Sequence, residues 1–81
     1  MGKLATGFNV DILYPDEYND FIAEIYFEGN FICIISQEHG SQDLDIEFNI
    51  YSVEKKLRVS LSHFRGAIDY AVERLYDLRK R

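Results

Sequence analysis

Apolar and polar residues alternate over the first two thirds of the chain. In the last third, apolar residues recur every three or four positions instead. Alternation with a period of two is typical of strands whose two faces have different surroundings. It occurs in residues 8–14, 21–28, 31–37 and 43–53. Turn-forming residues such as glycine, proline, asparagine and aspartate separate these segments. The pattern predicts four consecutive antiparallel strands, to which residues 57–59 could add a fifth.

After Ser60 the apolar residues recur every three or four positions, which predicts an amphipathic helix over residues 60–79. Ser60 is the expected N-cap, because its hydroxyl can accept a hydrogen bond from a free amide of the first turn. The predicted fold class is therefore α+β, a four-stranded or five-stranded antiparallel meander with one C-terminal helix packed on one face. The apolar stripe of the helix consists of Leu61, Phe64, Ile68, Ala71, Val72, Leu75 and Leu78.

All 81 residues fit a single domain. We expect residues 1–7 to be a loose lead-in, residues 8–59 the sheet, residues 60–79 the helix and residues 80–81 a basic tail. The single cysteine cannot form an internal disulfide, which suits a reducing compartment. No apolar run approaches the roughly 20 residues that span a bilayer, and the N-terminus lacks a signal-peptide pattern. We therefore expect a cytoplasmic protein without membrane contact.

The segment from Glu24 to Ile35 predicts a β-hairpin whose two faces differ. A two-residue turn at Gly29-Asn30 is favoured, because both residues tolerate positive φ. Residues directly opposite each other share a face, so this turn would fix the faces of both strands. One set of residues is almost entirely apolar and is expected beneath the helix: Ala23, Ile25, Phe27, Ile32 and Ile34.

The other face of the predicted sheet has no second helix to cover it. It combines carboxylates with tyrosine and aliphatic side chains, which is typical of a protein-binding surface. The alternative is that these side chains only shield one another across the strands. Cys33 also falls on this face, as a small apolar filler. The predicted partner-binding residues are Asp11, Glu24, Tyr26, Glu28, Phe31, Ile35, Asp45, Glu47 and Tyr51.

Charge divides the chain into an acidic first part and a basic last third. Residues 8–54 contain eleven acidic residues and no lysine or arginine, whereas residues 55–81 contain eight basic and three acidic residues. The acidic part repels phosphate backbones, which argues against direct nucleic-acid binding. It attracts basic proteins instead. Alternatively, the acidic residues only keep the protein soluble. The basic residues at the end of the helix either complement the helix dipole or contact phosphate.

The sequence carries no clear pattern of catalytic or metal-ligating residues. The sequence separations between His39, His63 and Cys33 do not match those typical of metal ligands. The stretch Asp43–Glu47 places three carboxylates on one side of a strand, where they could hold Mg²⁺ or Ca²⁺, although strand carboxylates this regular usually form a solvated face. The sequence contains neither a glycine-rich phosphate loop nor a nucleophile elbow. We predict a protein that is not an enzyme and that has no cofactor and no bound metal.

Three motifs stand in a fixed order: the acidic hairpin AEIYFEGNF with ISQE after it, the strand LDIEF, and the closing helix LSHFRGAIDYAVERL. This order, over residues 8–76, resembles small immunity proteins of bacterial contact-dependent growth inhibition and related polymorphic toxin systems. Such proteins bind one cognate toxin domain, often a nuclease, in the cytoplasm and neutralise it. The resemblance implies a stoichiometric inhibitor rather than a catalyst. The acidic face suits a basic toxin domain as the partner, and we expect the free chain to be a monomer or a weak dimer.

Two other functions stay open at the level of the sequence. The uncovered face could pair with a second copy or another partner, which would make this chain a homo-oligomerising or adaptor domain. An acidic fold could also imitate nucleic acid, as anti-restriction-type proteins do. Charge layout and resemblance together favour the immunity function over both.

Overall fold

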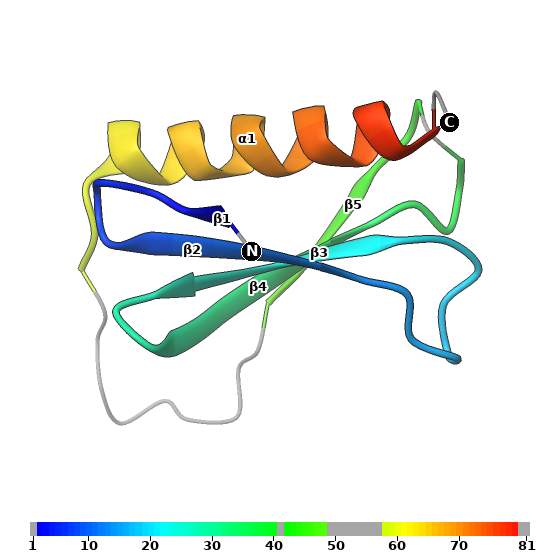
Figure 1. The fold of residues 1–81 in the computed structure, drawn as a ribbon, viewed down its shortest axis with the longest axis horizontal. Coiled ribbons are helices and arrows are strands. Elements are labelled where there is room, and N and C mark those ends of the chain that lie inside the picture. The colour runs from blue at the N-terminus through cyan, green and yellow to red at the C-terminus, as the bar shows by residue number, and fades with distance from the viewer. Residues whose placement is uncertain (1, 41, 49–57, 80–81) are drawn as a thin grey trace.

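The computed structural model describes residues 2–40, 42–48 and 58–79, which form one sheet and one helix (Figure 1). The strands lie side by side in chain order, each antiparallel to the next. The predicted α+β class, an antiparallel meander with one C-terminal helix, is confirmed. The elements are β1 (Gly2–Lys3), β2 (Phe8–Leu13), β3 (Ile22–Phe27), β4 (Asn30–Ser36), β5 (Asp45–Phe48) and α1 (Leu61–Arg79).

The N-terminal residues form a short strand rather than the loose lead-in predicted. Gly2 pairs with Val10 and Lys3 with Asn9, so β1 extends the sheet beyond β2. Gly7 lies in the left-handed region, with φ of 93°, and permits the reversal between the two strands. The fifth strand is therefore N-terminal. Of the segment expected to supply it, residues 58–59 form no strand and residue 57 lies outside the described residues.

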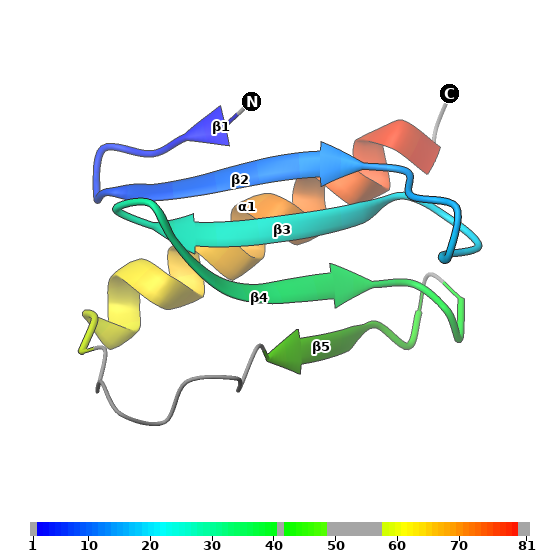
Figure 2. The ribbon, with the colours of Figure 1, turned by 90° about the horizontal axis from the view of Figure 1, so that it is seen from below.

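Helix α1 crosses one face of the sheet and begins at the predicted cap. Ser60 Oγ accepts a hydrogen bond from the His63 amide at 3.4 Å, and the Ser60 carbonyl accepts one from the Phe64 amide at 2.9 Å. Within the described residues, α1 contacts β2, β3 and β4 but not β5, which Figure 2 shows from the sheet side. No helix of this part of the chain combines the length and apolar character needed to cross a bilayer.

The core lies between α1 and the adjoining sides of β2, β3 and β4. Two small residues of the helix, Ala67 and Ala71, are fully buried, which lets the helix axis approach the sheet. The Phe64 ring packs at the margin, 5.9 Å from that of Phe8, whereas Leu61 of the predicted stripe is 70% exposed. The buried cluster consists of Phe8, Val10, Ala23, Ile25, Cys33, Ile35, Ala67, Ala71 and Leu75.

The turn of the β3–β4 hairpin lies one residue earlier than predicted. Glu28 and Gly29 form it, both with positive φ, at 48° and 85°. Phe27 therefore pairs with Asn30. Consecutive left-handed residues are typical of the two-residue turns that match the strand twist. Moving the turn by one residue shifts the pairing by two positions, which keeps each side chain on its predicted face.

A β-bulge in β4 shifts the pairing by one further position. Tyr26 pairs with Phe31, yet its neighbour Ile25 pairs with Cys33, so Ile32 is an extra residue in β4. A shift by an odd number moves every following side chain to the opposite face. Beyond Ile32 the faces of β4 are therefore reversed relative to the prediction.

The reversal corrects three predicted positions. Cys33 and Ile35, expected on the uncovered face, belong to the core, with Ile35 4% exposed and Cys33 fully buried. Ile34, expected beneath α1, lies on the uncovered face between Glu24 and Glu47. The sequence pattern could not reveal this reversal, because both the odd and the even positions of residues 31–35 are apolar.

We expect Ile35→Ala to lower the free energy of unfolding by about 2–5 kcal/mol, the range for truncating a buried isoleucine. Ile34→Ala, a matched control one residue away, is expected to cost about 1 kcal/mol or less, because Ile34 is only half-buried. Urea unfolding followed by circular dichroism measures both. If alanine at residue 35 unfolds the domain, the milder pair Ile35→Val and Ile34→Val replaces it. Ile35→Val is expected to lower the free energy of unfolding by about 1 kcal/mol. A larger loss at residue 34 would contradict the bulge.

Candidate protein-binding site

One row of side chains crosses four strands on the face opposite α1, the face that Figure 2 views. Asp11 pairs with Glu24, Glu24 with Ile34, and Ile34 with Glu47. Directly paired residues share a face, so carboxylates from β2, β3 and β5 flank one isoleucine from β4. We call Asp11, Glu24, Ile34 and Glu47 the acidic row.

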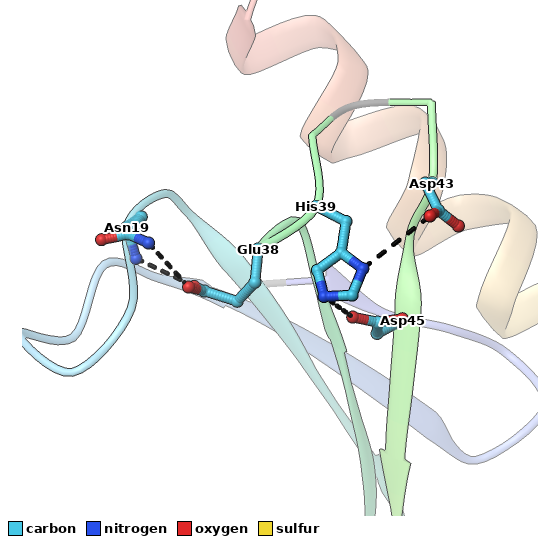
Figure 3. Close-up of polar contacts among 5 residues, drawn as sticks. All are labelled: Asn19, Glu38, His39, Asp43 and Asp45. Atoms are coloured by element: carbon cyan, nitrogen blue, oxygen red, sulfur yellow. Dashed lines mark hydrogen bonds and ion pairs between the residues drawn. The ribbon is translucent and has the colours of Figure 1, made fainter.

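No ion pair among the described side chains joins a cation to the acidic row. The ion pairs found in this part of the chain join the two ring nitrogens of His39 to Asp43 and Asp45, each at 3.8 Å (Figure 3). Asp11 and Glu24 lie directly opposite each other, an arrangement that destabilises a sheet when the charges are alike. Among the described side chains, the negative charge of the row therefore has no ion-pair partner.

Each carboxylate of the row accepts a hydrogen bond from a neighbouring neutral side chain. Such bonds orient the carboxylates without cancelling their charge. The donors are Asn9 Nδ2 to Asp11 Oδ1 at 2.9 Å, Tyr26 Oη to Glu24 Oε1 at 3.0 Å, and Tyr18 Oη to Glu47 Oε1 at 3.1 Å.

The two tyrosines remain hydrogen-bond donors over a wider pH range than usual. The hydrogen bond to Glu24 raises the pKa of Tyr26, and desolvation and the negative charges of Glu24 and Asp11 act in the same direction. Burial, followed by the hydrogen bond to Glu47, raises the pKa of Tyr18. Both phenols therefore stay protonated, which preserves the geometry of the row.

Tyr18 reaches Glu47 because two connecting segments meet at one end of the sheet. Glu38, after β4, accepts hydrogen bonds from the backbone N–H of Asn19 at 2.9 Å and from Asn19 Nδ2 at 2.8 Å (Figure 3). Asn19 lies in the connection between β2 and β3. These bonds hold that connection against the one between β4 and β5, and so place Tyr18 beside β5.

An aromatic pair and a hollow adjoin the row at the opposite end of β3. The rings of Tyr26 and Phe31 lie 5.4 Å apart between centroids, at an interplanar angle of 53°. Both side chains are half-buried. Beside them is an open hollow of about 550 Å³, lined by Gly7, Asn9, Asp11, Tyr26, Glu28 and Gly29.

The predicted partner-binding residues are mostly brought together. Glu28 lies in the turn at the edge of the face, whereas the prediction for Ile35 is wrong, since it is buried beneath α1. Tyr51 lies outside the described residues. The predicted residues found on the uncovered face are Asp11, Glu24, Tyr26, Phe31, Asp45 and Glu47.

Sequence reasoning missed three residues of this face. Ile34 was assigned to the core because the bulge has no signature in the alternation. Asn9 could have been predicted, because it precedes Asp11 by two residues in one strand and this spacing places both side chains on one face. Tyr18 gave no usable signal, because its hydrogen bond to Glu47 spans 29 positions of sequence.

Comparisons with models of known families, with curated proteins and with solved structures find no match to this chain. Among the described residues, no group of three or more histidine, cysteine, aspartate or glutamate side chains could hold a metal ion. The arrangement offers carboxylate acceptors beside an aromatic surface, which is the chemistry that binds cationic side chains.

Burial of Cys33 raises the pKa of its thiol to about 11. Because the thiolate is the reactive form, we expect the folded chain at pH 8 to react with iodoacetamide at least about a hundredfold more slowly than the urea-unfolded chain. The rate in the folded state should rise with pH toward 11 for as long as the fold persists. Mass spectrometry of quenched samples measures both rates. Similar rates in the two states would contradict the core position of Cys33.

Proposed function

We propose that this chain is an immunity protein that binds and neutralises a cognate toxin domain in the cytoplasm through the face carrying the acidic row. The observation that supports this is the alignment of Asp11, Glu24 and Glu47 across the sheet, with no ion pair to them among the described side chains. Like charges held together oppose folding. A basic protein partner would relieve that repulsion, and the resemblance to immunity proteins points to the same kind of partner.

Binding by itself accounts for inhibition, so the function requires no reactive group on this chain. A nuclease holds phosphates with basic side chains. Neighbouring strands lie about 4.8 Å apart, so the three strand spacings from Asp11 to Glu47 extend about 14 Å. Carboxylates over that span accelerate encounter with a basic cleft. The half-buried rings of Tyr26 and Phe31 supply the aromatic anchors that contribute most to such interfaces.

Reversing two charges of the row tests the proposal. We expect Glu24→Lys with Glu47→Lys to weaken binding of the cognate toxin domain by at least about a hundredfold, since close charge pairs at interfaces contribute roughly 1.5–7 kcal/mol each. Each gene neighbouring this one is expressed with each variant, and where the product is toxic, survival and the dissociation constant of the purified pair are measured.

The matched control is Asp69→Lys with Glu73→Lys, which makes the same change in net charge on exposed positions of α1. This variant is expected to protect as the unaltered chain does. Circular dichroism establishes that both variants fold. Full protection by the folded Glu24→Lys, Glu47→Lys variant would overturn the proposed binding face.

One observation favours self-association as a second candidate function. Ile46 and Phe48 are 42% and 54% exposed on the side of β5 that faces α1, where α1 does not reach. In the described part of the chain, β5 is the last strand of the sheet. An edge strand beside exposed apolar side chains could pair with a second copy.

Sedimentation equilibrium separates the two candidates. The proposed immunity function predicts a monomer of 9.5 kDa at micromolar concentration in the absence of toxin. Self-association predicts a dimer that Phe48→Lys dissociates and Asp69→Lys does not. A stable dimer of the unaltered chain with that behaviour would count against a free inhibitor.

A further inference from the structure

The hollow at the turn end of the candidate face is lined by two strands and two turns. Gly7 comes from the connection between β1 and β2, Asp11 and Tyr26 from β2 and β3, and Glu28 from the hairpin turn. The Glu28 amide donates to the Gly7 carbonyl at 3.0 Å, which joins the two turns. Its volume of about 550 Å³ lies in the range of about 300–1,000 Å³ that ligand pockets occupy.

Glycine at residue 7 keeps one wall of the hollow free of a side chain. An added Cβ at Gly7 would lie 3.2 Å from Phe27 Cε1 and 3.5 Å from Glu28 Cγ, in addition to the strain of its φ of 93°. At the neighbouring Gly29, an added Cβ would meet nothing within 4 Å. The space is therefore open at Gly29, whereas at Gly7 the Phe27 and Glu28 side chains already crowd the place of a Cβ, so that Gly7 bounds the hollow with backbone alone.

The ring of Tyr26 is held at both ends. Its hydroxyl donates to Glu24, and its ring contacts that of Phe31 with centroids 5.4 Å apart. A side chain fixed in this way loses little freedom when a ligand binds, which favours affinity. Tyr26 thus forms a preorganised aromatic wall of the hollow.

Two carboxylates of the lining remain available as acceptors. Asp11 Oδ1 accepts a hydrogen bond from Asn9, whereas its second oxygen has no bond to any of the described side chains. The Glu28 side chain is exposed in the turn and forms no ion pair with the described side chains. An occupant should therefore be cationic and should donate several hydrogen bonds.

We propose that this hollow is the anchor site for an arginine side chain of the basic partner, an inference that rests on the proposed immunity function. A guanidinium group is planar, stacks on aromatic rings and donates two parallel hydrogen bonds to a carboxylate, whereas a lysine ammonium is a hydrated point charge. The aromatic ring of Tyr26 and the acceptor oxygens of Asp11 and Glu28 suit a guanidinium group better than an ammonium group. A metal ion suits the hollow less, since no group of three possible ligands occurs among the described residues.

Titration of the ¹⁵N-labelled chain with N-acetyl-arginine-amide, followed by NMR, tests this directly. We expect saturable shifts at the amides of Gly7, Asp11 and Gly29, with a dissociation constant in the millimolar range, as suits one exposed charge-assisted contact. N-acetyl-lysine-amide should bind at least about fivefold more weakly, because it cannot bond in the same planar manner.

Variants assign the contacts. Asp11→Asn and Tyr26→Leu should each weaken arginine binding at least about fivefold, the effect of losing roughly 1 kcal/mol of charge or stacking interaction. Tyr26→Phe, which keeps the ring, should retain most of the binding. The control Asp43→Asn removes one exposed carboxylate at the other end of the sheet and should leave binding unchanged. Shifts that do not saturate, that spread equally to the Asp43 end, or that lysine reproduces at equal strength would overturn the arginine site.

The two proposals fail in different ways. If Glu24→Lys with Glu47→Lys abolishes protection while the arginine probe does not bind the hollow, the arginine site is wrong and the acidic face stands. If the probe binds as expected while that double variant protects fully, the hollow is an arginine site and the proposed toxin-binding face is wrong.

Discussion

The bulge at Ile32 is the constraint on which the arrangement of both faces depends. The β3–β4 pairing is central to the sheet, with β2 on one side and β5 on the other. An extra residue at this point fixes which side chains of β4 lie under α1 and which face away. It places Cys33 and Ile35 in the core and Ile34 between two carboxylates. The packing of the helix and the composition of the candidate binding face therefore follow from one local irregularity.

The carboxylates of the acidic row do not act as a single charge. The Debye length at physiological ionic strength is about 8 Å. Asp11 and Glu24, one strand spacing of about 4.8 Å apart, lie within that distance, whereas Asp11 and Glu47 are separated by about 14 Å. Within the row, Asp11 and Glu24 therefore act together at β2 and β3, whereas Glu47 acts separately at β5. The hollow is lined by Asp11 and so adjoins the paired carboxylates.

The sequence predicted what depends on regular repetition. Helix α1, its Ser60 cap and the alternating faces of β2 and β3 follow from local spacing, and the structure has them. The two-residue β1 was too short to show a period, and the bulge occurs in the run from Phe31 to Ile35, where either phase is apolar. Most of the acidic face was predicted because β2 and β3 are regular. Tyr18 and Ile34 were missed because their places depend on distant contacts and on the bulge.

Among the described strands, β5 pairs only with β4, and it lies away from α1; the Tyr18–Glu47 hydrogen bond adds a side-chain contact. Elements with few buried contacts open locally at a lower free energy than the core. Glu47 belongs to this loosely held strand, whereas Asp11 and Glu24 belong to the strands beneath the helix. A ligand that spans the whole row would therefore fasten β5 to the rest of the fold. Slower amide exchange in β5 would then accompany complex formation even where β5 itself contributes little contact area.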